Sequence, residues 1–190
     1  MSIRPILIHP DPRLKKKCEP VDAVDDAVRA LVADMFETMY DAPGIGLAAP
    51  QIGVISRILV MDCAGRSEDE NGDAIPEPPD PIAMINPEIL WVSDEKRVYN
   101  EGCLSIPELY DDVERPDRVR VAWLDEGGER REREFDGIRA TCVQHEIDHL
   151  NGKLFIDYLG PVKRSMITNK MKKLKRERAK EKAGGAGKSA

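Results

Sequence analysis

Apolar residues recur at helical spacing in two long segments of this chain. The first segment covers residues 22–40 and begins at a suitable N-cap, Asp22. The second covers residues 138–151 and is followed by Gly152, which would stop a helix. The apolar face of the second segment consists of Ala140, Val143, Ile147 and Leu150. We therefore predict two amphipathic helices. Cys142 extends the face that carries the histidines, so the second helix is apolar on much of its circumference and should be largely buried.

A third helix is predicted near the C-terminus, although its apolar stripe is narrow. Ile167, Met171 and Leu174 fall at i, i+4 and i+7 among many Lys and Arg residues. The glycine-rich residues 184–187 end this pattern, and we expect disorder beyond the helix. The chain should therefore consist of one domain at 1–162 and a basic helix with a tail at 163–190.

The region between the two long helices favours strands and loops. Residues 44–51 are small and apolar, and residues 64–81 are acidic and rich in Pro and Gly, so both are expected to be loops. Extended segments are predicted at 5–9, 54–61, 82–86, 89–93, 118–124 and 129–135, the last two joined by a turn at Gly127-Gly128. Helix, antiparallel strands and helix in this order predict an α+β fold, with antiparallel sheets around a central buried helix.

Composition fits one compact, mainly aliphatic core, since 41% of the 190 residues are hydrophobic and only 5% are aromatic. No apolar run is long enough for a membrane helix, and the first residues do not look like a signal peptide. The four cysteines, Cys18, Cys63, Cys103 and Cys142, include no C-x-x-C pair. We therefore expect a cytoplasmic protein with free thiols and no membrane partner.

Charge is distributed unevenly along the chain. Residues 163–190 contain eleven Lys or Arg and two Glu, so they carry +9. Since the whole chain carries −6, residues 1–162 carry −15. A basic tail on an acidic body suggests an anionic partner for the tail, although a solvated charged helix explains the pattern equally well.

The second helix carries the strongest chemical signal, in the sequence Gln144-His145-Glu146-Ile147-Asp148-His149. Helical positions four apart share one face, so both imidazoles can reach one cation. Glu146 lies beside them, where it can handle the proton of a water molecule. Buried imidazole and carboxylate groups also need polar partners, which a cation supplies. We predict a metal site on this helix.

The residue pattern leaves the third metal ligand open. One class of metalloprotease places a third His six residues after the second, but Phe155 occupies that position. Glu177 and Glu181 lie in the basic tail, where we expect them to be solvated. The upstream candidates are Cys103, beside Gly102 and outside any strong strand or helix pattern, and Cys142, one turn before His145. Either cysteine could instead be a small core residue.

Three segments together resemble the peptide deformylase family, whose members remove the formyl group from the N-terminal formyl-methionine of nascent bacterial polypeptides. The resemblance covers about residues 4–160 and keeps the family's motif order. The segments are Gly44-Ile45-Gly46-Leu47-Ala48-Ala49-Pro50-Gln51, Glu101-Gly102-Cys103-Leu104-Ser105 and Gln144-His145-Glu146-Ile147-Asp148-His149. Three motifs in order are a specific signal, whereas one alone would be weak.

The resemblance implies a role for each matching residue. Cys103, His145 and His149 would bind one divalent metal, with a water in the fourth position. Fe2+ would be the native metal, and Ni2+, Co2+ or Zn2+ could replace it, because an N2S ligand set does not choose among them. Glu146 would be the general base. The Gln51 amide and the Leu104 backbone N–H would stabilise the oxyanion.

The resemblance also implies how a formyl-methionyl peptide binds. The peptide would pair as an added strand with Ile45 and Gly46, next to Gly44. The methionine pocket would be lined by Ile45, Tyr99, Glu101, Ile138, Thr141, Cys142 and His145. Two positions depart from the family pattern: Thr141 replaces a branched aliphatic residue, and Tyr110 stands where some relatives carry Arg. Both departures concern substrate preference rather than the reaction.

Two other functions use the same residues. A zinc endopeptidase could use the same helix, but Phe155 and the position of Cys103 argue against it. A ribosome-binding protein with a structural metal would explain the basic tail. However, a structural metal site gives Glu146 no role and needs a fourth protein ligand. We treat docking of the 163–182 helix on ribosomal RNA as a separate hypothesis, and we expect no DNA partner.

Overall fold

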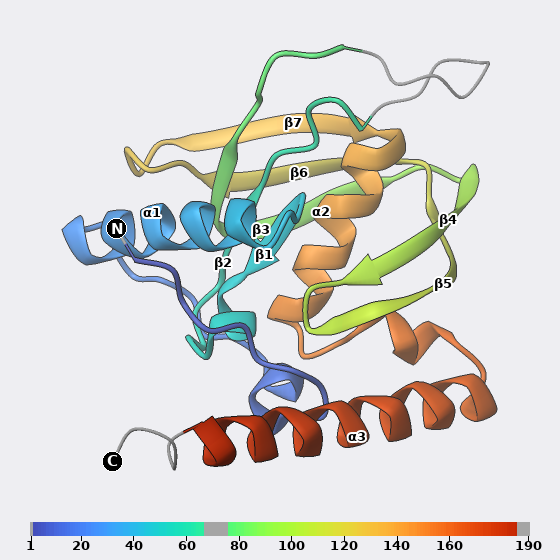
Figure 1. Cartoon of the computed structure of the whole chain (residues 1–190). Coiled ribbons are helices and arrows are strands. Elements are labelled where there is room, and N and C mark those ends of the chain that lie inside the picture. Colours follow the sequence, from blue (N-terminus) through green and yellow to red (C-terminus); the bar gives the residue numbers. More distant parts are fainter. Residues whose placement is uncertain (1, 67–75, 186–190) are drawn as a thin grey trace.

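The computed structural model describes residues 2–66 and 76–185, and it combines helices with antiparallel sheets (Figure 1). The helices are α1 (Asp26–Asp41), α2 (Gly137–Leu150) and α3 (Pro161–Gly185), with short 3-10 helices at Pro12–Lys15, Ala49–Ile52 and Phe155–Tyr158. The strands are β1 (Gly46–Ala48), β2 (Ile58–Met61), β3 (Ile82–Val92), β4 (Lys96–Cys103), β5 (Ile106–Pro116), β6 (Arg118–Leu124) and β7 (Arg130–Asp136).

The strands form two separate antiparallel sheets with α2 between them. Five strands pair in the order β1-β2-β3-β6-β7, while β4 and β5 form a two-stranded hairpin of their own. In Figure 1, α2 passes between the larger sheet and the hairpin. This arrangement confirms the predicted α+β fold, in which antiparallel sheets surround a central helix.

The apolar face predicted for α2 lies in the main core. Ala140, Val143, Ile147 and Leu150 are all buried there, against Phe135 and other residues of β6, β7 and β2. Ten of the fourteen residues of α2 are buried, which includes its polar residues. Each buried polar side chain therefore needs a partner inside the protein or a ligand.

Helix α1 packs against β1 and β2 through Val32, Met35 and Met39, which are fully buried. The prediction of Asp22 as its N-cap was wrong. The Asp25 side chain accepts a hydrogen bond from the Val28 N–H at 2.9 Å and starts the helix three residues later. Both aspartates suit an N-cap, and the sequence alone does not choose between them.

Four other predictions needed correction. The strand expected at 54–61 begins only at Ile58, as β2. Residues 44–51 are not only a loop, because β1 pairs with β2 and a 3-10 helix follows it. The strands expected at 82–86 and 89–93 are one strand, β3, with irregular pairing to β6. The cysteine of segment 101–105, expected outside any strand, ends β4 at the tip of the β4–β5 hairpin. The predicted 64–81 loop falls partly outside the described residues.

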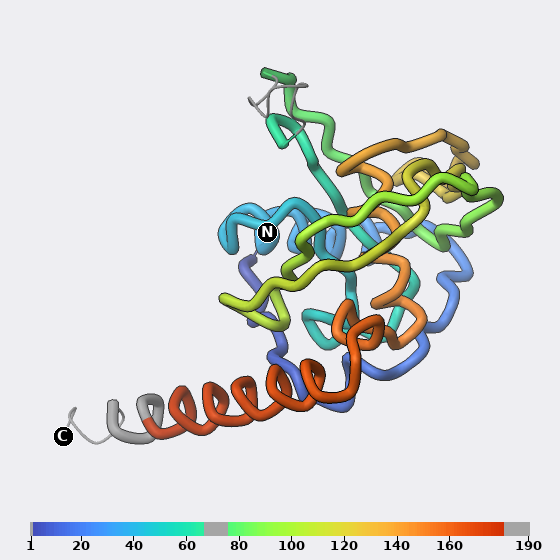
Figure 2. Tube along the Cα trace, turned by 90° about the vertical axis from the view of Figure 1, so that its right-hand side faces the viewer, coloured from blue at the N-terminus to red at the C-terminus, as the bar shows by residue number. Residues whose placement is uncertain are grey.

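Helix α3 lies along the outside of the body and extends past it (Figure 2). Ile167, Met171 and Leu174 pack against Leu14, Phe155 and neighbouring apolar residues, as the narrow stripe predicted. The helix begins at Pro161 and continues through Gly185, while residues 186–190 lie outside the described part. Within that part, no helix has both the length and the apolar character needed to cross a bilayer.

Candidate active site

The β4–β5 hairpin brings a cysteine to the two histidines of α2. Cys103 Sγ lies 3.2 Å from His149 Nε2. The candidate ligand atoms of Cys103, His145 and His149 all lie within 4.8 Å of one another. Burial lowers the pKa of His149 well below its usual value, so its ring is neutral, as a metal ligand must be. The set of one sulfur and two nitrogens fits a divalent transition metal.

A buried ion-pair network fixes the orientation of His145. Its Nδ1 atom lies 2.9 Å from Glu101 Oε2, which leaves Nε2 for a cation. Arg115 pairs with Glu101 on one side and with Asp148 on the other, at 3.1 Å and 2.8 Å. Burial alone would raise the pKa of Glu101, but hydrogen bonds from His145 and Arg115 keep it below its ordinary value. Glu101 therefore stays ionised beside the ligand ring, as carboxylates next to metal-binding histidines usually do.

Phe155 occupies the position at which one class of metalloprotease carries its third histidine. Its ring is fully buried and stacks on His145, with centroids 6.4 Å apart and planes at 24°. The aromatic ring therefore supports one wall of the site and offers no ligand atom. Of the downstream glutamates, Glu177 lies on α3 near Lys173, at 3.9 Å, and the side chain of Glu181 lies outside the described residues.

Glu146 is a buried carboxylate next to these ligand atoms. It is 5% exposed, and within the described residues its Oε2 atom has no hydrogen-bond partner. Burial, with a contribution from Glu101, raises the pKa of Glu146 to about 7. Gly46 lies directly against this carboxylate, since a Cβ at Gly46 would lie 2.5 Å from Oε1. The glycine therefore gives the backbone close access to Glu146.

Gln51 and Leu104 present hydrogen-bond donors to the same space. The Ala48 N–H donates to Gln51 Oε1 at 2.8 Å, which turns the Nε2 donor toward Cys103 Sγ at 3.6 Å and Ser105 Oγ at 3.3 Å. Leu104 lies in the turn of the β4–β5 hairpin. Across residues 2–66 and 76–185, its backbone N–H donates to no other backbone carbonyl.

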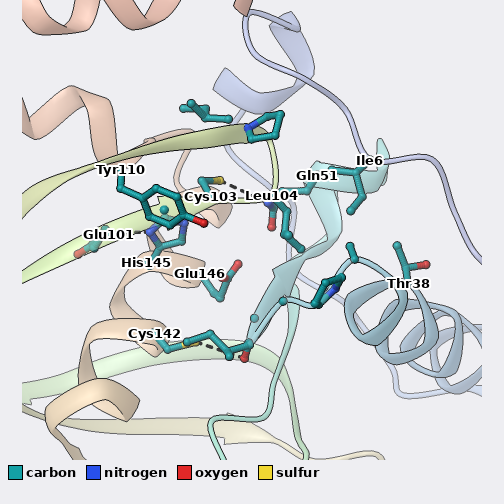
Figure 3. A pocket seen from close by; sticks show the side chains of 18 of the residues that line it. Ile6, Thr38, Gln51, Glu101, Cys103, Leu104, Tyr110, Cys142, His145 and Glu146 are labelled. Atoms are coloured by element: carbon teal, nitrogen blue, oxygen red, sulfur yellow. Dashed lines mark hydrogen bonds and ion pairs between the residues drawn. The ribbon is translucent and has the colours of Figure 1, made fainter. Parts of the chain in front are cut away.

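A cavity of about 770 Å³ opens onto these groups. In Figure 3, Cys103, His145 and Glu146 converge from the hairpin and from α2, and a dashed line joins Cys103 to Gln51. Every residue expected at the peptide or its first side chain lines this cavity: Gly44, Ile45, Gly46, Tyr99, Glu101, Tyr110, Ile138, Thr141, Cys142 and His145. Tyr110 is 65% exposed and covers Gly102 at the rim.

The sequence prediction missed several residues that shape the site. Arg115 and Asp148 hold Glu101 and the end of α2, and Ser105 contacts Gln51. Ile6 and other residues of the N-terminal segment line the cavity as well. Ser105 and Asp148 lie within two of the motif segments but received no role there, whereas Arg115 and Ile6 lie outside all three segments.

Comparison with known proteins assigns most of the chain to one family. The family model described as polypeptide deformylase matches residues 3–165. The chain is 55% identical to a peptide deformylase of Methylocella silvestris over 181 residues, covering 95% of this chain and 89% of the relative. It is 56% identical to peptide deformylase 1 of Burkholderia multivorans, covering 93% and 91%.

Solved structures give the same result. A crystal structure of peptide deformylase from Ehrlichia chaffeensis matches with a TM-score of 0.85 and 43% identity, covering 94% of this chain and 99% of that one. A second structure from that organism, in complex with actinonin, matches with a TM-score of 0.83 and 44% identity, covering 93% and 99%.

Proposed function

The chain belongs to the polypeptide deformylase family, and we propose how its residues carry out the reaction of that family. It is a hydrolase that removes the N-formyl group from the formyl-methionine of newly synthesised polypeptides and releases formate. The observation that carries the proposal is the cavity onto which Cys103, His145 and Glu146 all open. Formate release from formyl-Met-Ala by anaerobically purified protein, with metal analysis, tests it directly.

Cys103, His145 and His149 would hold the metal. Their donor atoms are close enough to share one cation, and Glu101 holds the second nitrogen of His145. A divalent ion bound there would supply a Lewis acid that polarises water and the formyl carbonyl. We propose Fe2+ as the native ion. A thiolate beside iron is sensitive to oxidation, so we also propose a reducing cytoplasm, in keeping with four free cysteines.

Glu146 would hold and move the proton of the reaction. An attacking water must lose a proton, and the leaving amine must gain one. The carboxylate is buried, lacks a partner at Oε2 within the described residues, and has a pKa near neutrality. It can therefore accept a proton at neutral pH and return it to the amine nitrogen, which makes it both general base and general acid.

Gln51 and Leu104 would stabilise the oxygen that becomes negatively charged. The Gln51 amide is 1% exposed and is oriented by the Ala48 N–H, so its donor is fixed before the substrate arrives. The Leu104 N–H is available because it lies in the hairpin turn. Oriented donors at this position stabilise the transition state more than the ground state.

The peptide would lie along β1, at the wall opposite the hairpin. Ile45 and Gly46 offer backbone groups for strand-like pairing, and Gly44 leaves room beside Leu104. The remaining cavity residues Tyr99, Glu101, Tyr110, Ile138 and Cys142 would surround the peptide and its first side chain. Because the related Ehrlichia protein forms a complex with actinonin, we propose that this cavity binds actinonin as well.

The endopeptidase and the structural metal protein are not favoured. The third ligand candidate is Cys103, from a hairpin that is distant from α2 in the sequence but adjacent to it in space. Phe155 occupies the position that a protease histidine would take. A structural site is closed by a fourth protein ligand. Within the described residues, the metal cluster has three members and borders an open cavity.

We propose that α3 docks on the ribosome, whose RNA is anionic, near emerging chains. The apolar side of α3 is buried against the body, and most exposed residues from Lys170 to Lys180 are Lys or Arg. Deletion of residues 163–190 would also remove the buried Ile167 and Met171. Charge reversal at the exposed Lys173, Arg176 and Lys180 is therefore the better test. Ribosome co-sedimentation should fall at low salt, and unchanged pelleting would refute docking.

A further inference from the structure

Besides Glu146, a second polar side chain on the described part of α2 faces the cavity without a protein partner. Thr141 lines the cavity and is only 6% exposed. Within residues 2–66 and 76–185, its hydroxyl makes no hydrogen bond. The neighbouring Cys142 thiol, by contrast, donates to the Ile45 carbonyl oxygen at 3.5 Å. The hydroxyl oxygen of Thr141 is not among the fully buried atoms that lack a partner, so it reaches the cavity, where it is available to a ligand.

Threonine on a helix usually satisfies its hydroxyl locally, and a second threonine at the same cavity does so. The Thr38 hydroxyl donates to the Asp34 carbonyl oxygen, one turn earlier on α1, at 2.7 Å. It also accepts a hydrogen bond from the Arg4 N–H at 2.9 Å. Thr141 makes neither kind of bond, so its side chain is not held by its own helix.

The position of Thr141 relative to the metal ligands suggests which part of a ligand it meets. Ile138, Thr141, Cys142 and His145 share one face of α2, at i, i+3, i+4 and i+7. Thr141 therefore lies one turn before His145, about 6 Å along the helix axis. The substrate's formyl carbonyl would react beside His145 and Glu146. A substrate side chain that extends from there along this face of α2 would end near Thr141.

We propose that Thr141 is a specificity-determining residue for the first side chain of the substrate. This inference rests on the proposed function. The Thr141 hydroxyl donates a hydrogen bond to an acceptor at the position of the methionine sulfur. Thioether sulfur is a weak acceptor, whereas the oxygen of methionine sulfoxide is a strong one. The substrate class thus includes formyl peptides that begin with oxidised methionine, which an entirely apolar pocket would reject.

Three peptides separate this role from general packing: formyl-Met-Ala, formyl-norleucine-Ala and formyl-methionine-sulfoxide-Ala. Norleucine has the shape of methionine with a methylene in place of sulfur. Thr141→Val exchanges the hydroxyl for a methyl group. We expect kcat/KM to fall about tenfold for the sulfoxide and about twofold for methionine, with little change for norleucine. Thr141→Ser, which keeps the hydroxyl, should restore most of the sulfoxide activity.

The sulfoxide provides a stereochemical test as well, because its sulfur is chiral. A single hydroxyl in a fixed position should favour one epimer in the wild type, and Thr141→Val should abolish that preference. The matched control is Thr38→Val, at a cavity threonine whose hydroxyl is already bonded. This control should leave the ratios among the three peptides unchanged, whatever its effect on stability.

Several outcomes would overturn the proposal: equal losses for all three peptides in Thr141→Val, no loss for any of them, or the same epimer preference in both proteins. Calorimetric binding of the products Met-Ala and methionine-sulfoxide-Ala gives a readout that does not depend on turnover, and the valine variant should lose affinity for the sulfoxide. Unchanged affinity there refutes the role of Thr141, whereas absence of formate release by the wild type refutes the proposed function.

Discussion

Glu101 Oε2 lies 2.9 Å from Nδ1 of His145, and both side chains are buried. The two residues come from β4 and α2, and Arg115 holds the same carboxylate from β5. The contact fixes which nitrogen of His145 can face a cation. It also joins the hairpin that supplies Cys103 to the helix that supplies both histidines, so the metal site depends on the docking of these two elements.

Glu101→Gln should weaken metal binding without abolishing it. The neutral amide cannot balance the charge of Arg115 and orients His145 less firmly. Changes next to a metal ligand commonly reduce metal affinity by about 10-fold to 100-fold. Competition with a chelator measures the effect. Glu114→Gln, which breaks an exposed pair with Lys96, is the matched control and should keep wild-type affinity.

Cys103→Ala should lose the bound metal, because two imidazoles alone bind it weakly. Metal content after anaerobic purification provides the measurement. Cys18→Ala, at a buried cysteine of the core, should keep one metal per chain. Full metal content in the Cys103 variant would show that another residue is the third ligand.

Glu146→Gln should keep the metal and lose most formate release. The amide has nearly the same shape but cannot accept a proton, and proton transfer by a positioned group contributes about 10²-fold to 10⁴-fold. The assay is formate release from formyl-Met-Ala, with metal content measured on the same sample. If this variant worked at the wild-type rate, Glu146 could not be the base.

Gly46→Ala should reduce kcat by at least about tenfold, because its methyl group would displace the Glu146 carboxylate. The same methyl would press on the Cys142 thiol, so we expect a stability loss of about 1–3 kcal/mol. Gly160→Ala is the control, since a Cβ there meets nothing within 4 Å. Equal activity of both variants would show that the close approach at Gly46 is not needed.

Burial of the His9 ring, whose Nε2 atom lies 3.0 Å from Thr168 Oγ1, should make stability depend on pH. Burial first, and then Lys15, lower the pKa of His9 to about 4 from 6.5, with Asp157 opposing and two α3 lysines, Lys172 and Lys175, assisting. The unfolded chain therefore binds more protons between these pH values. The contribution of His9 to the free energy of unfolding is complete above pH 6.5 and is lost as the pH falls toward 4.

Between pH 7 and pH 5, wild-type protein should lose about 1–2 kcal/mol more unfolding free energy than His9→Gln, which cannot titrate. Urea unfolding at both pH values measures this difference. The comparison with the variant cancels the titration of the other acidic and basic groups. An equal loss of unfolding free energy in the wild type and in His9→Gln would show that His9 does not cause this pH dependence.

The sequence by itself determined the features that depend on local spacing. The helical spacing of apolar residues in 138–151 predicted the buried face of α2. It also predicted that His145 and His149 lie together with Glu146 beside them, because residues four apart share one face of a helix. The same reasoning gave the stripe of Ile167 and Met171 that attaches α3. Motif order then indicated the family that the comparisons show.

Only the tertiary structure decided which distant groups meet. Strand β4 is almost entirely exposed up to Glu101, so it lacks the alternation that reveals a strand, and the position of Cys103 stayed open in the residue pattern. The pairing of Glu101 with Arg115, the stacking of Phe155 on His145 and the unpartnered hydroxyl of Thr141 all depend on how the hairpin, the sheet and α2 pack together. Such contacts join residues far apart in the chain, and no local period specifies them.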